Sequence, residues 1–330
     1  MKIYCKKFFP LFILFSILTA CSGDDESGNP NNDPEPPEEQ TVVNTISLVA
    51  EKVETPQAPY NPGNYSVWFS MVANTIYYAN PSNTAVPQFM LKYSVSGNYF
   101  HTLTSHEEVC ACGYSSKIVG DENRLFYIAN EAWRYNVGSN NWTELSYPND
   151  FHQNNGETGV TYHQNKVYFL GGRDSSTRFK YYDTTMDDWG DLPTYPYPVD
   201  TPDLAVVNNK IYALGGDVDK KKFGVYEEGS GWTQLTDLNF QAINGSGQHT
   251  VASFQNRFIF IMNELNTNSV KIHVYDTQEN EWKENPIEVV LEGDNNSNYM
   301  NLFSNNSYLY VVTKDYDNEM SLHKISVNFD

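Results

Sequence analysis

The sequence contains few cysteines and few basic residues, and both scarcities exclude classes of protein. Only 4 of its 330 residues are cysteine. Cys5 and Cys21 lie near the N-terminus, so only Cys110 and Cys112 lie in the body of the chain. They form neither a disulfide framework nor a zinc-finger spacing. Lys and Arg number 21 against 41 Asp and Glu, a net charge of -20. This charge repels phosphate backbones, so we expect no nucleic-acid partner.

The short motifs of common catalytic sites are also missing. No segment resembles a serine nucleophile elbow, a phosphate-binding loop or a dinucleotide fingerprint. The acidic loops at Glu292 (EGDNNSN) and Asp315 (DYDNE) do not match an EF-hand. We expect these loops to be solvated surface, and calcium binding is the alternative. Arginines are few, and no set of tyrosine, histidine and cysteine suits copper. We therefore predict no catalytic residue, no cofactor and no metal.

The N-terminal segment has the features of a secretory leader. Three lysines precede an apolar run from Phe8 to Leu18 that is too short to span a membrane. The next residues end at Cys21 and resemble a bacterial lipobox, which implies cleavage before this cysteine and lipidation of its thiol. We predict a signal peptide over residues 1–20 and a membrane anchor at Cys21. The alternative is an ordinary signal peptide in which this cysteine has no role.

Residues 21–44 contain an acidic stretch, SGDDESGNPNNDPEPPEEQ, with no aliphatic or aromatic side chain. Such a composition does not offset chain entropy, so we predict a disordered tether. Its acidic cluster from Asp24 to Glu26 resembles the surface-export signal of Bacteroidetes lipoproteins. That resemblance implies an outer-membrane lipoprotein exposed on the cell surface.

Beyond the tether, one pattern occurs six times at intervals of 42 to 50 residues. In each copy an asparagine precedes an aromatic and aliphatic run, beginning at Asn74, Asn123, Asn165, Asn209, Asn256 and Asn306. Asparagine tolerates the positive φ of tight hairpins, so each copy predicts a turn followed by a strand. A repeat of this length gains its core by stacking copies.

Each of the first five copies is followed by a regularly spaced aromatic pair. The pairs are Tyr93 and Phe100, Tyr135 and Trp142, Tyr182 and Trp189, Tyr226 and Trp232, and Tyr275 and Trp282. In the third copy we predict four antiparallel strands, at Thr158–His163, Lys166–Leu170, Arg178–Tyr182 and from Trp189. The turn residue, the apolar strand, the glycine pairs at 171–172 and 215–216 and the aromatic pair resemble kelch-repeat β-propellers.

This resemblance covers residues 45–330 and implies an all-β fold, a six-bladed kelch-type β-propeller. The sixth copy supplies only three strands, at Tyr299–Ser304, Tyr308–Thr313 and Ser321–Val327. The segment Thr45–Val53 precedes the first copy, which already has four strands of its own. We therefore predict that this N-terminal strand completes the last blade and closes the ring.

Candidate ligand-binding residues lie on loops of one face, called the top face, where the first strand of each blade begins. The candidates are Tyr195, Tyr197, Asp200, Asp203, Arg173 and His249. Prolines around the two tyrosines restrict their backbone, and rigid aromatics near carboxylates suit a sugar ring. The alternative is that the tyrosines only cap the junction of blades three and four. For His249 the alternative is a structural hydrogen bond. Cys110 and Cys112, two positions apart on one strand, could direct two thiolates toward a metal, and the alternative is burial as small hydrophobic residues.

The sequence thus favours an envelope-anchored propeller that binds a glycan or an envelope protein on its top face. One alternative is a sugar-modifying enzyme, a mutarotase or epimerase, which rests on fold analogy alone. Another is a structural subunit of an outer-membrane assembly, which would present an apolar patch in place of a polar cavity.

Overall fold

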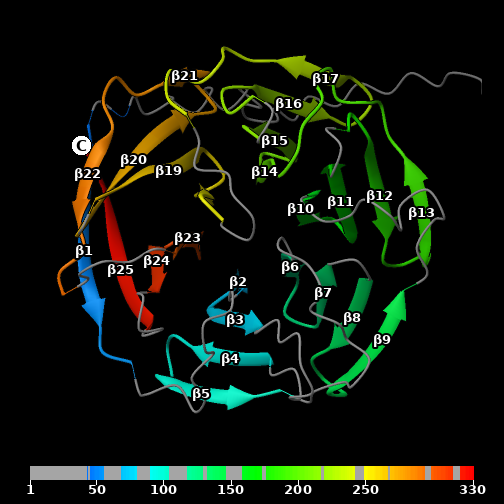
Figure 1. Cartoon of the computed structure of the whole chain (residues 1–330), viewed down its shortest axis with the longest axis horizontal. Helices are drawn as coiled ribbons and strands as arrows, with labels where there is room; N and C mark the ends of the chain where they lie inside the picture. The colour runs from blue at the N-terminus through cyan, green and yellow to red at the C-terminus, as the bar shows by residue number, and fades with distance from the viewer. Residues whose placement is uncertain are drawn as a thin grey trace, which may run out of the picture. The chain divides into compact units, whose positions relative to one another are not determined.

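The computed structural model describes residues 43, 45–55, 68–79, 90–103, 117–128, 132–145, 158–172, 176–216, 219–241, 249–266, 268–293, 299–314 and 320–330. Across these residues, strands form six antiparallel sheets around a central axis (Figure 1). Residues 43–330 are thus a six-bladed β-propeller, and the predicted fold is confirmed. Within the same ranges, no helix is long and apolar enough to cross a membrane.

The first three blades each contain four strands in sequence order, counted from the axis outward. Blade one has β2 (Trp68–Val72), β3 (Thr75–Ala79), β4 (Met90–Ser94) and β5 (Tyr99–Thr102). Blade two has β6 (Lys117–Gly120), β7 (Arg124–Ile128), β8 (Ala132–Asn136) and β9 (Asn141–Leu145). Blade three has β10 (Thr158–His163), β11 (Lys166–Gly171), β12 (Phe179–Asp183) and β13 (Asp188–Asp191), within about one residue of the predicted ranges.

The remaining blades complete the ring. Blade four has β14 (Asp203–Val207), β15 (Lys210–Leu214), β16 (Phe223–Glu227) and β17 (Gly231–Gln234). Blade five has β18 (Val251–Phe254), β19 (Phe258–Asn266), β20 (Ser269–Asp276), β21 (Glu281–Trp282) and β22 (Ile287–Val290). Blade six has β23 (Tyr299–Ser304), β24 (Leu309–Lys314), β25 (Met320–Phe329) and, as its outer strand, β1 (Ile46–Val53).

The closing strand β1 confirms the predicted closure. It runs antiparallel to β25 over eight residue pairs, from Ile46 opposite Phe329 to Val53 opposite Leu322. Beyond this ladder, the N–H groups of Thr45 and Asp330 each donate to the carbonyl of the other, at 3.2 and 3.0 Å. The two ends of the described chain therefore meet in one blade.

A hairpin connection followed by a strand forms at all six asparagines, as predicted, but only four of these asparagines have the predicted positive φ. Asn165, Asn209, Asn256 and Asn306 have φ between 51 and 64°. In blade one, however, Ala73 takes the positive φ in place of Asn74. In blade two, the turn is longer, and the Asp121 carboxylate accepts the N–H groups of Asn123 and Arg124 at 2.9 and 2.8 Å. A side chain thus stabilises that turn without positive φ at the asparagine.

The aromatic pairs lie directly opposite each other on the third and fourth strands of a blade. Ring centroids are 4.9 to 5.5 Å apart in all five pairs. Four of the tyrosines also donate their hydroxyl to the residue five positions later, namely Asn98, Asn140, Asp187 and Asn280. Each acceptor has φ between 51 and 56°. One recurrent contact therefore fixes both the outer strand and its turn.

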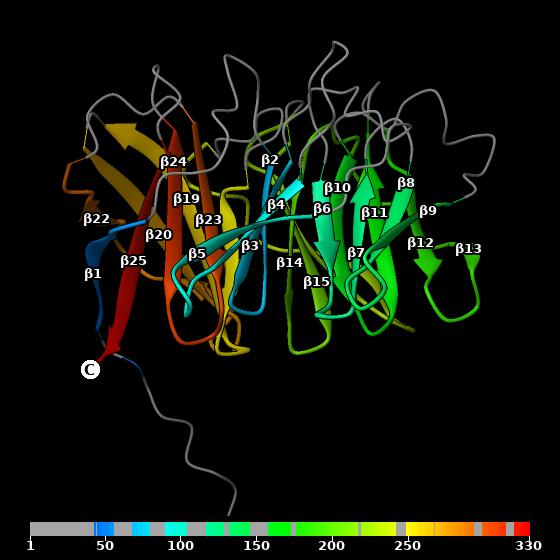
Figure 2. The ribbon, with the colours of Figure 1, turned by 90° about the horizontal axis from the view of Figure 1, so that it is seen from below.

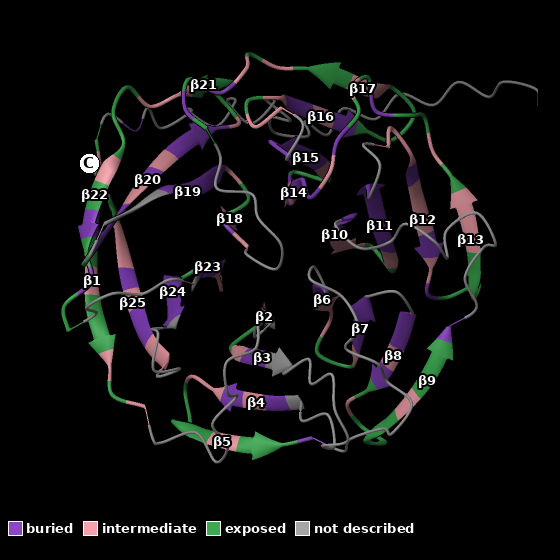
Figure 3. Cartoon of the chain, in the orientation of Figure 1, coloured by how far each residue is buried: buried purple, intermediate pink, exposed green. Residues whose placement is uncertain are grey.

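Burial is greatest in second strands such as β7, β11 and β15, which are almost wholly buried where the blades pack face to face. The first strands β6 and β10 are partly exposed, and the outer strands β5, β9 and β17 are mostly exposed (Figure 3). The largest core cluster joins blades five and six and includes Phe260, Leu302 and Leu48 of the closing strand. The aromatic and aliphatic runs of the repeat therefore supply the junctions between blades.

The strands of a blade alternate in direction, which defines two faces. Hairpins between the first and second strands lie on one side of the ring, the bottom face (Figure 2). The first strands begin at the opposite, top face, at residues such as Lys117 and Asp203. Because β1 pairs antiparallel with β25, Thr45 and Asp330 lie at the bottom face.

Candidate functional site

One cavity lies on the propeller axis, within the ring of first strands. It has a volume of about 220 Å³ and is lined by residues of β2, β6, β10, β14, β18 and β23, together with His249. This volume is well above the ~10–15 Å³ that one water needs, and below the ~300–1,000 Å³ of pockets for drug-sized ligands. The channel therefore has room for a small ligand or for one ring of a larger one.

The lining combines apolar and hydroxyl groups. The apolar part includes Ile118, Val160, Leu204, Val206 and Leu302. The hydroxyls belong to Ser70, Thr161, Ser253 and Ser304, whereas the hydroxyl of the lining residue Tyr162 donates to the Asp121 carboxylate at 2.6 Å. Among the described lining residues none is Asp, Glu, Lys or Arg, and His249 is the one titratable side chain besides Tyr162. The channel wall thus offers neutral hydrogen-bonding groups on an apolar surface.

A polar cluster lies at the top of this channel, centred on Asp203 at the start of β14. Its Oδ2 accepts the Thr250 N–H at 3.0 Å and the Thr250 hydroxyl at 2.7 Å. Its Oδ1 lies 3.6 Å from Lys117 Nζ and 3.9 Å from His249 Nδ1. The backbone N–H of His249 in turn donates to Asn301 Oδ1 at 2.7 Å. We call these five residues, from blades two, four and six and from the segment leading into blade five, the Asp203 cluster.

Burial makes this arrangement obligatory. Asp203 is 3% exposed and Lys117 is 4% exposed. An unpaired buried charge carries a desolvation cost of several kcal/mol, so each side chain needs the other in place. The two Thr250 donors further stabilise the carboxylate. The charges of Lys117 and Asp203 therefore compensate each other within the cluster.

His249 is the member of the cluster that lines the cavity. Burial, and then the neighbouring Lys117 ammonium, lower the pKa of His249 to about 3, although Asp203 acts in the opposite direction. The imidazole is therefore neutral at pH 7, with one donor and one acceptor nitrogen. Its Nε2 is buried and has no hydrogen-bond partner within the described residues. The same is true of Asn301 Nδ2. Buried polar atoms without partners are rare and need an explanation such as a ligand or water.

The structure brings together two of the six predicted site residues, Asp203 and His249. Tyr195 instead packs between blades three and four, where it is 2% exposed and its ring lies 4.6 Å from that of Trp232. Tyr197 contacts the Tyr195 ring at 5.7 Å, and its hydroxyl donates to Gln234. Neither tyrosine is among the described residues that line the channel. Their contacts are those of a blade junction, and a role in ligand binding stays a prediction.

The other predicted residues are placed as follows. Asp200 is half-buried on the segment that leads into β14. Arg173, Cys21, Cys110 and Cys112 lie outside the described residues. Within the ranges that the structure describes, no group of three or more His, Cys, Asp or Glu side chains is arranged to hold a metal ion.

Sequence reasoning missed Lys117, Thr250 and Asn301. Each lies at or near the start of a first strand, directly before or within an apolar run: KIVG, TVASF and NLFS. A polar residue at the top end of an otherwise apolar inner strand was the available signal. It was too weak alone, because only the ring geometry brings strands from different blades together.

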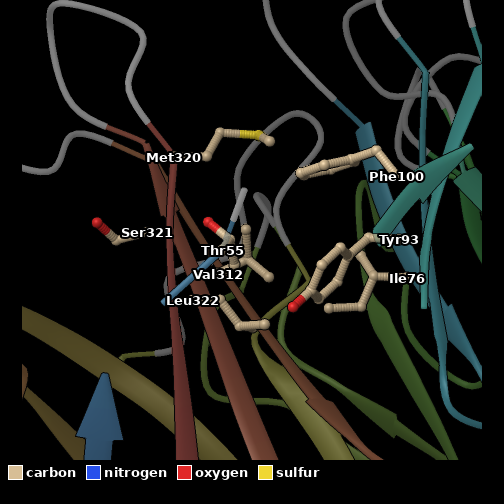
Figure 4. A pocket seen from close by; sticks show the side chains of 8 residues that line it. All are labelled: Thr55, Ile76, Tyr93, Phe100, Val312, Met320, Ser321 and Leu322. Atoms are coloured by element: carbon tan, nitrogen blue, oxygen red, sulfur yellow. The ribbon is translucent and has the colours of Figure 1, made fainter. Parts of the chain in front are cut away.

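A second hollow lies where blades six and one meet (Figure 4). Ile76, Tyr93 and Phe100 of blade one face Val312, Met320 and Leu322 of blade six, with Thr55 and Ser321 beside them. Its volume of about 30 Å³ has room for little more than a water molecule. We interpret it as a packing gap at the closing junction.

Comparison with known protein families finds no match for this chain, and no curated protein is significantly similar. The argument for function therefore depends on the fold and on the channel.

Proposed function

We propose that this protein is a kelch-type propeller lipoprotein, anchored to the outer membrane through Cys21, that binds a glycan at the top of its central channel. One observation carries the proposal: a cavity of about 220 Å³ on the axis is lined by hydroxyl-bearing side chains and by His249, whose Nε2 has no hydrogen-bond partner among the described residues. Preformed concave sites with a few convergent polar groups are typical of ligand binding.

The repeat geometry supports the kelch type. The aromatic pairs are opposite each other in five blades, and their tyrosines fix the outer turn in four. The glycine pair of blade three is also explained, because Gly171 has φ 74° and a Cβ there would lie 2.5 Å from the Val199 carbonyl. Only glycine fits such a position.

The position of the chain's entry supports display of the channel. The propeller begins at Thr45, which lies at the bottom face, whereas the Asp203 cluster lies at the top. The chain therefore enters the propeller on the face opposite the proposed binding site.

Glycan binding can be tested by filling the channel. Ser253→Phe places a ring in the lining and should abolish binding of the mature protein to a glycan array, while Ser96→Phe in an exposed turn should not. Equal binding by both folded variants would refute the channel as the site. Binding of an envelope protein in pull-down, with no glycan retained, would favour the protein ligand.

Anchoring is tested separately. Cys21→Ala should move the protein from the membrane fraction to the soluble fraction without changing its melting temperature, because acyl chains alone hold it. Protease treatment of intact cells then reports surface exposure. Full protection of the wild-type protein would place it on the periplasmic side.

A mutarotase or epimerase is the second candidate, favoured by the neutral His249 next to a charged pair. A neutral imidazole has a nitrogen lone pair that can accept a proton from a sugar hydroxyl, but a pKa of about 3 makes His249 a weak base, so any acceleration should be small. Proton NMR of freshly dissolved α-glucose would show faster anomer interconversion with the wild-type protein than with His249→Phe. Identical rates would exclude this catalysis and leave ligand binding as the one candidate function.

A further inference from the structure

The charges around the channel indicate which ligands it accepts, an inference that rests on the proposed function. We propose that the channel selects a neutral hydroxylated ligand, such as a neutral sugar ring, and rejects the corresponding sugar acid. Three features of the described residues support this selectivity, and each concerns what a carboxylate or a hydroxyl would meet inside the channel.

First, the described lining offers no cation. It consists of apolar side chains, including Met71 and Phe303, of Ser70, Thr161, Ser253 and Ser304, of Tyr162, whose hydroxyl is bonded to Asp121, and of the imidazole of His249. A carboxylate that enters this wall loses water and gains no opposite charge there. Burial of an unpaired charge is strongly unfavourable, whereas burial of a hydroxyl needs only one or two hydrogen bonds.

Second, the nearest buried cation is already opposed. Lys117 Nζ lies 3.6 Å from Asp203 Oδ1, and both side chains are almost fully buried. An anionic ligand would have to approach Lys117 against the like charge of Asp203. The net charge of the chain, -20, further lowers the local concentration of anions. Both effects favour neutral over acidic ligands.

Third, the groups left without partners suit a hydroxyl. His249 is one of the residues that line the cavity, and its buried Nε2 has no hydrogen-bond partner among the described residues. Asn301, whose Oδ1 accepts the backbone N–H of His249, likewise has no described partner for its Nδ2. A neutral imidazole presents Nε2 as donor in one tautomer and as acceptor in the other. A hydroxyl serves either case, because it both donates and accepts. A carboxylate only accepts.

The test compares sugars that differ only at C6. Glucose and glucuronic acid, and galactose and galacturonic acid, are titrated into the mature protein at pH 7 and followed by saturation-transfer NMR. We expect at least one neutral sugar to bind about tenfold or more tightly than its acid, which corresponds to about 1.4 kcal/mol. His249→Phe should abolish most of this binding. His163→Phe is the matched control, because His163 Nε2 is also buried without a partner but does not line the channel.

The outcomes separate this inference from the proposed function. Tighter binding of an acid than of its neutral partner, lost in His249→Phe, would overturn the selectivity and leave the channel as the site. If neither His249→Phe nor Ser253→Phe changes sugar binding, both the selectivity and the channel as the binding site are refuted. No binding of any of the four sugars overturns the sugar-ring class, while the glycan array still decides the proposed function. If His249→Phe does not fold, Ser253→Ala removes one lining hydroxyl and should weaken the neutral sugar about threefold.

Discussion

The closing strand β1 provides the sharpest test of the fold, because its two faces have opposite environments. Leu48 is 9% exposed and belongs to the core cluster between blades five and six. Its neighbour Val49 is 60% exposed. If β1 completes blade six as observed, Leu48→Ala removes buried contacts, whereas Val49→Ala removes almost none.

The expected magnitude follows from burial. Leu-to-Ala substitutions in cores cost ~2–5 kcal/mol, and an outer strand relaxes more readily than a central one, so we expect about 2–3 kcal/mol for Leu48→Ala. Val49→Ala should cost less than about 1 kcal/mol, the range of β-propensity alone. In a domain of this size, the core substitution should lower the melting temperature by roughly 5–10 °C.

Urea unfolding, followed by tryptophan fluorescence, measures both variants in a form that lacks the leader and carries Cys21→Ala. The midpoint should fall for Leu48→Ala at an unchanged slope, since the exposed area on unfolding stays similar. Equal midpoints for the two variants would refute the seating of β1. A larger loss for Val49→Ala would mean that the register is shifted by one residue, which exchanges the two faces.

Three further predictions concern turns, pH and packing. Asn280→Ala should cost about 1–2 kcal/mol in urea unfolding, because it removes the acceptor of the Tyr275 hydroxyl at a residue with φ 55°. Because the native pKa of His249 is about 3 and the unfolded value is 6.5, its contribution to stability is complete above pH 6.5 and is lost as the pH falls toward 3. His249→Gln should remove this part of the pH dependence. Gly159→Ala should cost about 1–3 kcal/mol, because its Cβ would lie 2.5 Å from the Pro202 carbonyl.

Each of these has a matched control. Asn280→Gly removes the acceptor but relieves the backbone, so it should be less destabilising than alanine, and the reverse order would contradict the role of φ. Stability profiles of wild type and His249→Gln that run parallel from pH 7 to 4 would contradict the burial of a neutral imidazole. Gly138→Ala has open space, with its nearest contact at 3.6 Å, and should be near neutral. An equal loss at Gly159 and Gly138 would point to the backbone and not to the Pro202 contact.

Much of the fold could be predicted from sequence, because the repeat encodes local contacts. The aromatic pairs, for example, are opposed across adjacent strands, so a fixed spacing such as Tyr182 to Trp189 follows from one hairpin. The turn at Asn74 forms as predicted, but Ala73 takes the positive φ, because either of two neighbouring turn residues can adopt it. The outer strand β22 was also missed. It pairs with β20 beyond the two-residue β21, where no repeat pattern indicates it.

The site was only partly predictable, because it depends on distances between blades. Asp203 and His249 were candidates as polar residues near the entry to first strands, and the structure places them 3.9 Å apart. Lys117 lies 86 positions before Asp203 in the sequence, and nothing local indicates that their side chains meet. The proline-flanked tyrosines suggested an exposed platform, yet Tyr195 fills a blade junction. Rigidity of a loop does not determine which way its side chains turn.

The closing strand and the channel site are physically coupled. The Leu302 N–H donates to the His249 carbonyl at 2.7 Å, and the backbone N–H of His249 donates to the Asn301 side chain. Blade six therefore fixes the backbone of His249, whose side chain lines the cavity. The inner strand β23 pairs with β24, β24 pairs with β25, and β25 pairs with β1, so β1 completes the sheet that holds β23. No residue of β1 lines the channel among those described, so any effect of β1 on the proposed site must pass through blade six. Since β1 follows the proposed tether, the strand next to the proposed anchor is also the outer strand of the blade that contacts His249.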